Sequence, residues 1–314
     1  MSFNLPSVSE VVPFHKNEIS TYRLCTVLKT KGCSYARHSG GCLHCSLLQN
    51  AVNDVSDESL LSQFDFSIAQ NTDFDYSHID LLVLGSFLDD EEVSTYVRKS
   101  LLKKVSLLPV ESVTIESRPE YITLDKIEEC ISLLNGVKLE IALGIESTND
   151  YIRDEILRKN NTMDEIEKVI ALLAKCGVQM LGYVLIKPPG ICEREGIKDG
   201  ISSSIDIFNL GKKYGIETRV ALQPMYIPKD SYAYQQYIDN QYMPPRVWSI
   251  IEILKHISHK GSVNVALNDE GLANGRTLSN CGICTPSMIE LLKKFNYSND
   301  IHVFDDYYCN CKEI

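Results

Sequence analysis

Three cysteines lie close together near the start of the chain, in the stretch CSYARHSGGCLHC at residues 33–45. Three thiolates can hold a metal or an iron–sulfur cluster and still leave one coordination position open, as a reactive centre requires. Gly40 and Gly41 would let the backbone wrap closely around a bulky cluster. Two other interpretations of the spacing stay open: a zinc knuckle completed by His38 or His44, and three unrelated buried cysteines. The cysteines are Cys33, Cys42 and Cys45.

A second group of cysteines lies near the end of the chain, in two short pairs separated by the helix-like SMIELLKKF. The pairs are Cys281-x-x-Cys284 and Cys309-x-Cys311. Such pairs are typical of a closed four-thiolate zinc site, and tetrahedral sulfur also suits an auxiliary iron–sulfur cluster. We predict structural zinc ahead of a second cluster, because the site would tie down a segment that has little core of its own. Four free cysteines are the third option.

The composition is that of an ordinary globular chain. It has 314 residues, 11 cysteines, a net charge of −11 and a pI of about 5.2. No stretch approaches the roughly 20 apolar residues of a membrane helix, and the N-terminus lacks the features of a signal peptide. We therefore expect a cytoplasmic protein with no membrane partner. The acidic balance argues against a surface that attracts nucleic acid as a whole, but it allows a local basic patch.

Short apolar runs alternate with helical patterns along most of the chain. Strands separated in this way predict an α/β fold with a parallel sheet, wound right-handedly, and with functional sites at the carboxyl ends of the strands. Six such units, fewer than the eight of a full barrel, predict a partial (βα)6 barrel. The predicted strands cover residues 22–30, 78–86, 112–117, 137–147, 178–187 and 218–225.

The pattern also suggests how the chain is divided. Residues 1–20 are expected to be a lead-in with a few polar turns, and residues 21–228 the core barrel. Residues 229–314 are expected to form a C-terminal extension that ends in the four-cysteine metal site. The extension contains PPRVWSIIEILKHI, a helix that we expect Pro244 and Pro245 to open.

Small, acidic or basic residues follow four of the predicted strands, where they would meet at one edge of the sheet. They are Gly85 and Ser86, Glu116 and Arg118, Glu146 and Ser147, and Lys187. Ordinary roles are open to several of them: a strand-to-helix turn for Gly85-Ser86, an exposed ion pair for Arg118 and a helix N-cap for Ser147. We interpret the acidic run at residues 89–92 as favourable charge in the first turn of a helix.

The order of these motifs resembles the radical S-adenosylmethionine (SAM) superfamily, in its variant with a long first cysteine spacing. Within it the chain is similar to the radical SAM subunit of archaeosine synthase, a family that modifies tRNA. The likeness covers about residues 20–314. It is carried by KGCSYARHSGGCLHC, LGSFLDDEEV, VTIESRPEYIT, EIALGIESTND, YVLIKPPG, MPPRVWSIIEIL and the tail motifs SNCGIC and CNC.

The resemblance implies a role for each matched residue. Cys33, Cys42 and Cys45 would hold a 4Fe-4S cluster whose open iron binds SAM. Gly85 and Ser86 would receive the amino group of SAM, Glu116 its ribose and Arg118 its carboxylate. The remaining candidates for SAM binding are Glu146, Ser147 and Lys187, and Gln223 is expected to border adenine or substrate.

The function implied is that of a radical SAM enzyme, which cleaves SAM reductively to a 5′-deoxyadenosyl radical that abstracts hydrogen from a substrate. By resemblance the reaction would be a C–N lyase step in archaeosine formation, with a synthase subunit and tRNA as partners. A flavodoxin- or ferredoxin-type protein would supply the electron. The acidic pI and the sequence near the sixth strand also allow a diverged relative that acts on a small nucleoside or sugar. A non-catalytic zinc-binding module is the alternative of another class.

Overall fold

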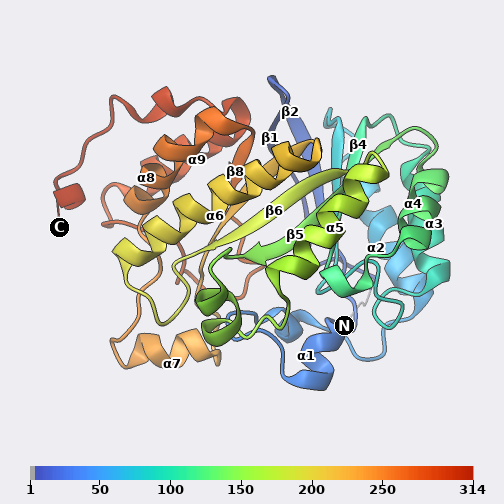
Figure 1. Cartoon of the computed structure of the whole chain (residues 1–314), viewed down its shortest axis with the longest axis horizontal. Coiled ribbons are helices and arrows are strands. Elements are labelled where there is room, and N and C mark those ends of the chain that lie inside the picture. The colour runs from blue at the N-terminus through green and yellow to red at the C-terminus, as the bar shows by residue number, and fades with distance from the viewer. Residues whose placement is uncertain (1–3, 314) are drawn as a thin grey trace.

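The computed structural model describes residues 4–313, which are built around one eight-stranded sheet. The strands are hydrogen-bonded in their order along the chain; β1 is antiparallel to β2, and β2 to β8 are parallel. Figure 1 shows the sheet curving around an interior space. The strands are β1 (Val8–Lys16), β2 (Ile19–Val27), β3 (His78–Leu82), β4 (Ser112–Ser117), β5 (Lys138–Glu146), β6 (Gln179–Ile186), β7 (Thr218–Pro224) and β8 (Val263–Val265).

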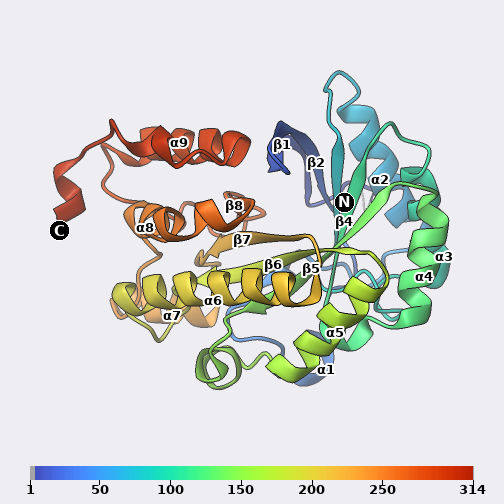
Figure 2. The same cartoon turned by 45° about the horizontal axis from the view of Figure 1, so that its top comes forward.

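Helices cover the outer face of this sheet, and the apolar core lies between the two layers (Figure 2). They are α2 (Asp57–Gln70), α3 (Thr95–Val105), α4 (Leu124–Leu134), α5 (Met163–Lys175), α6 (Glu193–Tyr214), α8 (Val247–Ile257) and α9 (Thr285–Ser298). Two short helices, α1 (Ser34–Ser39) and α7 (Tyr232–Ile238), lie instead beyond the carboxyl ends of the strands (Figure 1). Short 3-10 turns cover Leu47–Asn50, Pro119–Tyr121, Ser258–Lys260, Ile301–Phe304 and Asn310–Glu313, and a π-helical turn covers Tyr151–Ile156. Within residues 4–313 no helix is both long and apolar enough to cross a membrane.

The predicted α/β barrel is confirmed, and its six predicted strands correspond to β2 to β7. Two further strands lie outside the six. Residues expected to be a lead-in form β1, which turns into β2 through Asn17 and Glu18, both with positive φ (50° and 63°), as a two-residue hairpin turn requires. Pro13 is tolerated within β1 because this is an edge strand. The C-terminal extension adds β8 to the other edge.

The two edge strands, β1 and β8, face each other across a seam where the sheet does not close. Helix α9 packs beside this seam and satisfies the free edge of β8. The Asn296 side chain accepts from the Val265 N–H and donates to the Val265 carbonyl, both at 2.8 Å, and Asn299 accepts from the Val263 N–H at 3.0 Å. Side chains of α9 therefore take the place of a ninth strand.

Two local expectations were wrong. Helix α3 begins at Thr95, after the N-cap Ser94, so the acidic run at residues 89–92 lies outside its first turn. Asp89 and Glu92 are instead buried. Helix α8 begins at Val247 with Arg246 as its N-cap, so the two prolines precede the helix rather than open it.

Candidate functional site

The carboxyl ends of the parallel strands surround a cavity of about 270 Å³ that we call the cysteine chamber. Cys33, Cys42 and Cys45 all line it, so the structure brings the three cysteines of the first motif together. Of the other residues expected at the site, Gly85, Glu116, Arg118, Glu146 and Gln223 also line this chamber.

The cysteine loop is held by its own turns and by a close contact with Gly85, which follows β3. Cys33 is the N-cap of α1, and Gly40 ends that helix in the left-handed conformation at φ 84°. Gly85 packs directly against Cys33: a Cβ on Gly85 would lie 2.6 Å from Cys33 Cα, so no larger residue fits. Because residue 85 has no side chain, the cysteine loop can pack directly against the end of β3.

The two buried acids of residues 89–92, Asp89 and Glu92, form hydrogen bonds that hold this loop in place. Glu92 accepts from the Ser86 N–H at 2.7 Å and from the Thr30 hydroxyl at 2.5 Å, and Asp89 accepts from the hydroxyl of Ser34. Burial raises the pKa of Glu92 to about 7. These contacts join the cysteine loop to the β3 end.

Arg118 reaches across the chamber to the second cysteine. Its Nη1 lies 3.7 Å from Cys42 Sγ, its Nη2 donates to the Lys159 carbonyl at 2.9 Å, and its Nε donates to Glu120 at 2.5 Å. The guanidinium also lies over the Tyr35 ring, 4.2 Å from the centroid. A fixed positive charge therefore stands next to a thiol that could act as a thiolate ligand.

Glu146 and Lys159 form a buried ion pair on the neighbouring wall, with 2.8 Å between Nζ and Oε1. Burial alone would raise the pKa of Glu146, but the Lys159 ammonium outweighs burial and holds this pKa below its usual value. Glu146 has φ 64°, a strained conformation for a non-glycine residue, at an irregularity in the pairing of β5 with β6. His44 Nε2 lies 4.0 Å from Glu146, and His44 Nδ1 is buried without a hydrogen bond.

Glu116 differs from Glu146 because no lysine or arginine among the described residues lies within 4.0 Å of its carboxylate. One carboxylate oxygen accepts from the Val83 N–H at 3.0 Å. Burial raises the pKa of Glu116 well above its usual value. The group is a hydrogen-bond acceptor without a counter-ion, directed toward the chamber.

Three residues predicted for the site point elsewhere, and none of them lines the chamber. The Ser86 hydroxyl accepts from the Arg118 N–H at 3.0 Å, so it positions that residue. The Ser147 hydroxyl donates to Asp199 on α6 at 2.7 Å. Lys187 pairs with Glu193 at 2.6 Å and donates to the Met243 carbonyl at 2.8 Å.

Sequence reasoning missed Lys159, Asn268 and Glu270, which also line the chamber. Lys159 lies between Arg158 and Asn160, both left-handed, in a stretch without helical or strand periodicity. Asn268 and Glu270 follow β8, which has only three residues and gives almost no strand signal. The detectable signal was chemical: a run of Asn, Asp and Glu directly after an apolar triplet.

The four tail cysteines form a separate, compact group, in which all sulfurs lie within 4.8 Å of one another. The Sγ–Sγ distances are 3.5 Å for Cys281–Cys284, 3.7 Å for Cys281–Cys309 and 3.5 Å for Cys284–Cys311. These values match the edges of a tetrahedron around one metal ion with Zn–S bonds of about 2.3 Å. The Trp248 indole N–H donates to Cys311 Sγ at 3.3 Å and so links the group to α8.

The first cysteine group is more widely spaced than this. Among the described residues, the tail cysteines are the one set of three or more Cys, His, Asp or Glu ligand atoms so close together. A zinc knuckle formed by Cys33, Cys42, Cys45 and a histidine would need that close spacing. The donor set of the chamber fits a larger group better than a single ion.

Comparison with known proteins gives three similar curated sequences. An uncharacterized protein of Methanocaldococcus jannaschii, MJ0550, is 36% identical over 93% of this chain and 80% of its own length. Archaeosine synthase subunit beta of Methanosarcina acetivorans is 27% identical over 95% of this chain and 85% of its own. The subunit beta of Thermococcus kodakarensis is 25% identical over 91% and 88%.

This chain belongs to the same family as MJ0550 and is a relative of archaeosine synthase subunit beta. No family model matches it. Among solved structures, Elp3 of Methanocaldococcus infernus superposes with a TM-score of 0.52 at 17% identity, over 74% of this chain and 57% of Elp3. SuiB of Streptococcus suis bound to S-adenosylmethionine gives 0.50 at 11%, over 79% and 50%. This chain thus spans 57% of Elp3 and 50% of SuiB, and the likeness to both is one of fold.

Proposed function

We propose that this chain reductively cleaves SAM at a 4Fe-4S cluster held by Cys33, Cys42 and Cys45, and that the resulting 5′-deoxyadenosyl radical abstracts hydrogen from a substrate. The observation that carries the proposal is the cysteine chamber itself. Three thiols line one cavity at the strand ends, spaced more widely than one metal ion needs. Iron–sulfur clusters are normally held by cysteine thiolates, and three of them leave one iron for another ligand.

The chain's own residues would bind and orient SAM. Backbone carbonyls at Gly85, after β3, would receive the methionine amino group, and Glu116 offers an acceptor without a counter-ion for the ribose hydroxyls. Arg118 and Lys159 are the cations on the walls and would bind the carboxylate. In this proposal Ser86 acts through Arg118, and Ser147 and Lys187 support the wall from outside the chamber.

The direct test is anaerobic incubation of reconstituted protein with SAM and dithionite, followed by an assay for 5′-deoxyadenosine. We expect the product, together with about four iron atoms per chain, not counting any metal bound by the tail cysteines. A non-catalytic zinc module would instead give colourless protein that holds zinc at both cysteine groups. Absence of product, with iron below about three atoms per chain after reconstitution, would overturn the cluster assignment.

By resemblance we propose a C–N lyase step in archaeosine formation as the reaction, in the cytoplasm. Two relatives are named archaeosine synthase subunit beta, which supports a synthase subunit as partner. The lysine-bearing deazaguanine adduct in tRNA would be the substrate, and a flavodoxin- or ferredoxin-type protein the reductant. A tRNA-binding assay over a salt series tests this, because phosphate contacts give a steep dependence on salt.

A second candidate, chemistry on a small nucleoside or sugar, is favoured by the charge of the chain. The net charge is −11, whereas contacts to RNA phosphates come from lysine and arginine. Weak, salt-insensitive tRNA binding, both alone and with the synthase subunit, would support this candidate over the first.

We further propose that the tail cysteines hold a structural zinc ion rather than a second cluster, since their sulfurs are 3.5–3.7 Å apart. Cys284→Ser should lose about one zinc per chain by metal analysis. It should also expose the tail to limited proteolysis, because the ion joins the chain end to α8.

The matched control for this variant is Cys130→Ser, which changes a buried cysteine that packs in the core and has no cysteine partner. It should keep its zinc. Full retention of zinc in Cys284→Ser, or iron in its place in the wild type, would contradict the assignment.

A further inference from the structure

A second and larger interior cavity, of about 580 Å³, lies under the seam between β1 and β8; we call it the seam chamber. It adjoins the cysteine chamber, because Leu82, Tyr183, Gln223 and Glu270 line both. A molecule in the seam chamber would therefore face the place where SAM is proposed to bind. This volume is large enough for a small organic group.

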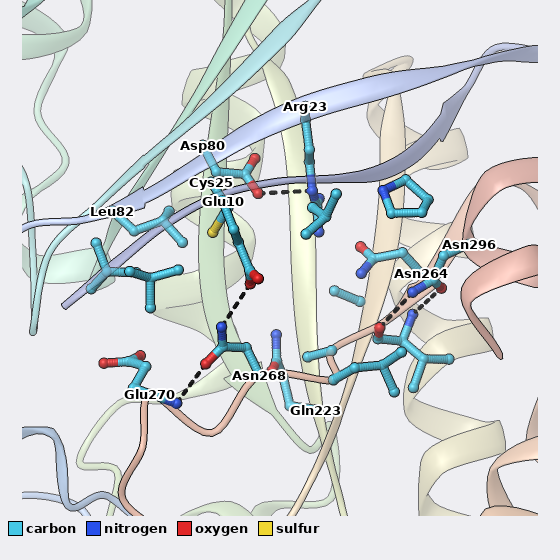
Figure 3. A pocket seen from close by; sticks show the side chains of 18 of the residues that line it. Glu10, Arg23, Cys25, Asp80, Leu82, Gln223, Asn264, Asn268, Glu270 and Asn296 are labelled. Carbon is cyan, nitrogen blue, oxygen red and sulfur yellow. Dashed lines mark hydrogen bonds and ion pairs between the residues drawn. The ribbon is translucent and has the colours of Figure 1, made fainter. Parts of the chain in front are cut away.

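Hydrogen bonds through the Asn268 side chain connect Glu10 on one side of the seam with Glu270 on the other (Figure 3). The Asn268 amide donates to Glu10 Oε1 at 2.7 Å, and the Asn268 carbonyl oxygen accepts from the Glu270 N–H at 2.6 Å. Glu10 comes from β1 and Glu270 from the loop after β8, so the two edges of the open sheet present their carboxylates to one space.

Two oxygens in this space have no partner. Asn264 on β8 is 7% exposed, and its Oδ1 is buried without a hydrogen bond; the residue lines the seam chamber (Figure 3). Glu270 Oε2 is likewise buried and without a hydrogen bond. A buried acceptor is costly unless it is satisfied. A hydrogen-bond donor on a bound molecule would satisfy both oxygens.

The charges of the seam chamber leave an excess of acid. Arg23 is matched by Asp80 at 3.1 Å, and Lys293 by Glu290 at 2.8 Å. Among the described residues, no lysine or arginine lies within 4.0 Å of the carboxylates of Glu10 or Glu270. Burial raises the pKa of Glu270 to about 7, as expected for a carboxyl group that lacks a counter-ion.

A divalent metal ion is not the occupant that this arrangement favours. The ligand atoms of Glu10, Asp80 and Glu270 do not form one of the close groups that a single ion requires among residues 4–313. Dispersed carboxylates and amide oxygens suit an extended N–H donor better, since such a group can reach several acceptors at once.

We propose that the seam chamber binds a positively charged nitrogen group of the substrate, of the ammonium, amidinium or guanidinium type, through Glu10, Glu270 and Asn264. That the bound group belongs to a substrate rests on the proposed function. It narrows the substrate to molecules that carry such a group on the side presented to the radical. A neutral sugar or an unsubstituted nucleoside could donate hydrogen bonds to these acceptors, but it would leave the carboxylates of Glu10 and Glu270 without a counter-charge.

Benzamidine and its neutral analogue benzamide test the proposal by isothermal titration, with and without the reconstituted cluster and saturating SAM. We expect benzamidine to bind with a Kd in about the millimolar range or below, and benzamide at least about tenfold more weakly. Glu270→Gln and Glu10→Gln should each weaken benzamidine about tenfold, because each removes one negative charge from the chamber. Glu252→Gln, which changes an exposed carboxylate on α8, is the matched control.

Equal binding of the two probes, no binding of benzamidine, or unchanged affinity in both interior variants would overturn the proposal. Displacement of benzamidine by SAM would do so too, because it would place the probe in the cysteine chamber. Two interior variants are used so that the test still stands if one of them fails to fold. The titration needs neither the cluster nor turnover, so loss of 5′-deoxyadenosine formation would count against the proposed function and leave this result standing.

Discussion

Replacement of Cys42 by alanine should abolish 5′-deoxyadenosine formation, by more than about a hundredfold, because the cofactors supply the chemistry and cannot be held without their ligands. Cys42 is the most informative of the three cysteines. It lies in the chamber and within 3.7 Å of the Arg118 guanidinium, so the loss would report on both the cluster and its surroundings. Product would be measured by chromatography after anaerobic reconstitution, and iron by metal analysis.

The control must be a cysteine away from the chamber. Cys176 lies beside a cavity with Lys138 and Gln179, at the amino ends of β5 and β6, so it is at the opposite end of the barrel. Cys176→Ala should keep full iron and product. If Cys42→Ala also kept them, or if both variants lost them equally, the cysteine chamber could not be the cluster site. Zinc in place of iron in the wild type would point to a binding module.

The carboxyl-end site could largely be predicted because strand order is set by apolar runs. Six runs separated by helices place six strand ends on one rim, and the residues after them converge whatever the details of packing. Gly85, Glu116 and Glu146 line the chamber for this reason. Side-chain direction was the weaker step. Successive strand residues point to opposite faces, so Glu146 faces the chamber while Ser147 bonds to Asp199 on α6.

The seam could not be predicted, because its elements give weak local signals. Residues 8–16 contain Pro13, which argues against a strand except at an edge. Strand β8 has three residues, and its free edge is satisfied by Asn296 and Asn299, some thirty residues further along the chain. Such long-range side-chain bonds have no periodic signature. The acids at the seam, Glu10 and Glu270, are therefore brought together only when the curved sheet places its two edges opposite each other.

A buried charge network fills the barrel interior at the end opposite to the chamber, and it should dominate stability. Glu140 is fully buried and accepts two bonds from Arg219, at 3.0 and 2.6 Å, one from Lys16 at 3.0 Å and one from Thr114 at 2.6 Å. Arg219 is itself 2% exposed and stacks over Phe14. Lys16 also lies 3.7 Å from Glu217, whereas Glu140 is the ion-pair partner of the buried Arg219.

Glu140→Gln should lower the free energy of unfolding by about 3–5 kcal/mol, because it leaves the buried Arg219 guanidinium without its ion-pair partner. Burial alone would raise the pKa of Glu140, but Arg219 and Lys16 hold this pKa well below its ordinary value of 4.5. A carboxyl group with a lowered pKa stabilises the fold above its ordinary pKa, and that contribution is lost as pH falls through the folded-state pKa. The variant should therefore also lose part of the acid dependence of stability, measured by urea unfolding at several pH values.

The comparison that isolates the buried charge is Glu167→Gln, which alters a half-buried surface carboxylate bonded to Tyr214 and Lys213 and should change stability little. A second variant, Arg219→Met added to Glu140→Gln, should recover part of the loss, because it removes the buried cation that the first substitution leaves uncompensated. If the single variant were as stable as the wild type, water would have to reach this end of the barrel and solvate Arg219. If the double variant recovered nothing, the hydrogen-bond geometry around residue 140, rather than its charge, would hold β1, β5 and β7 together.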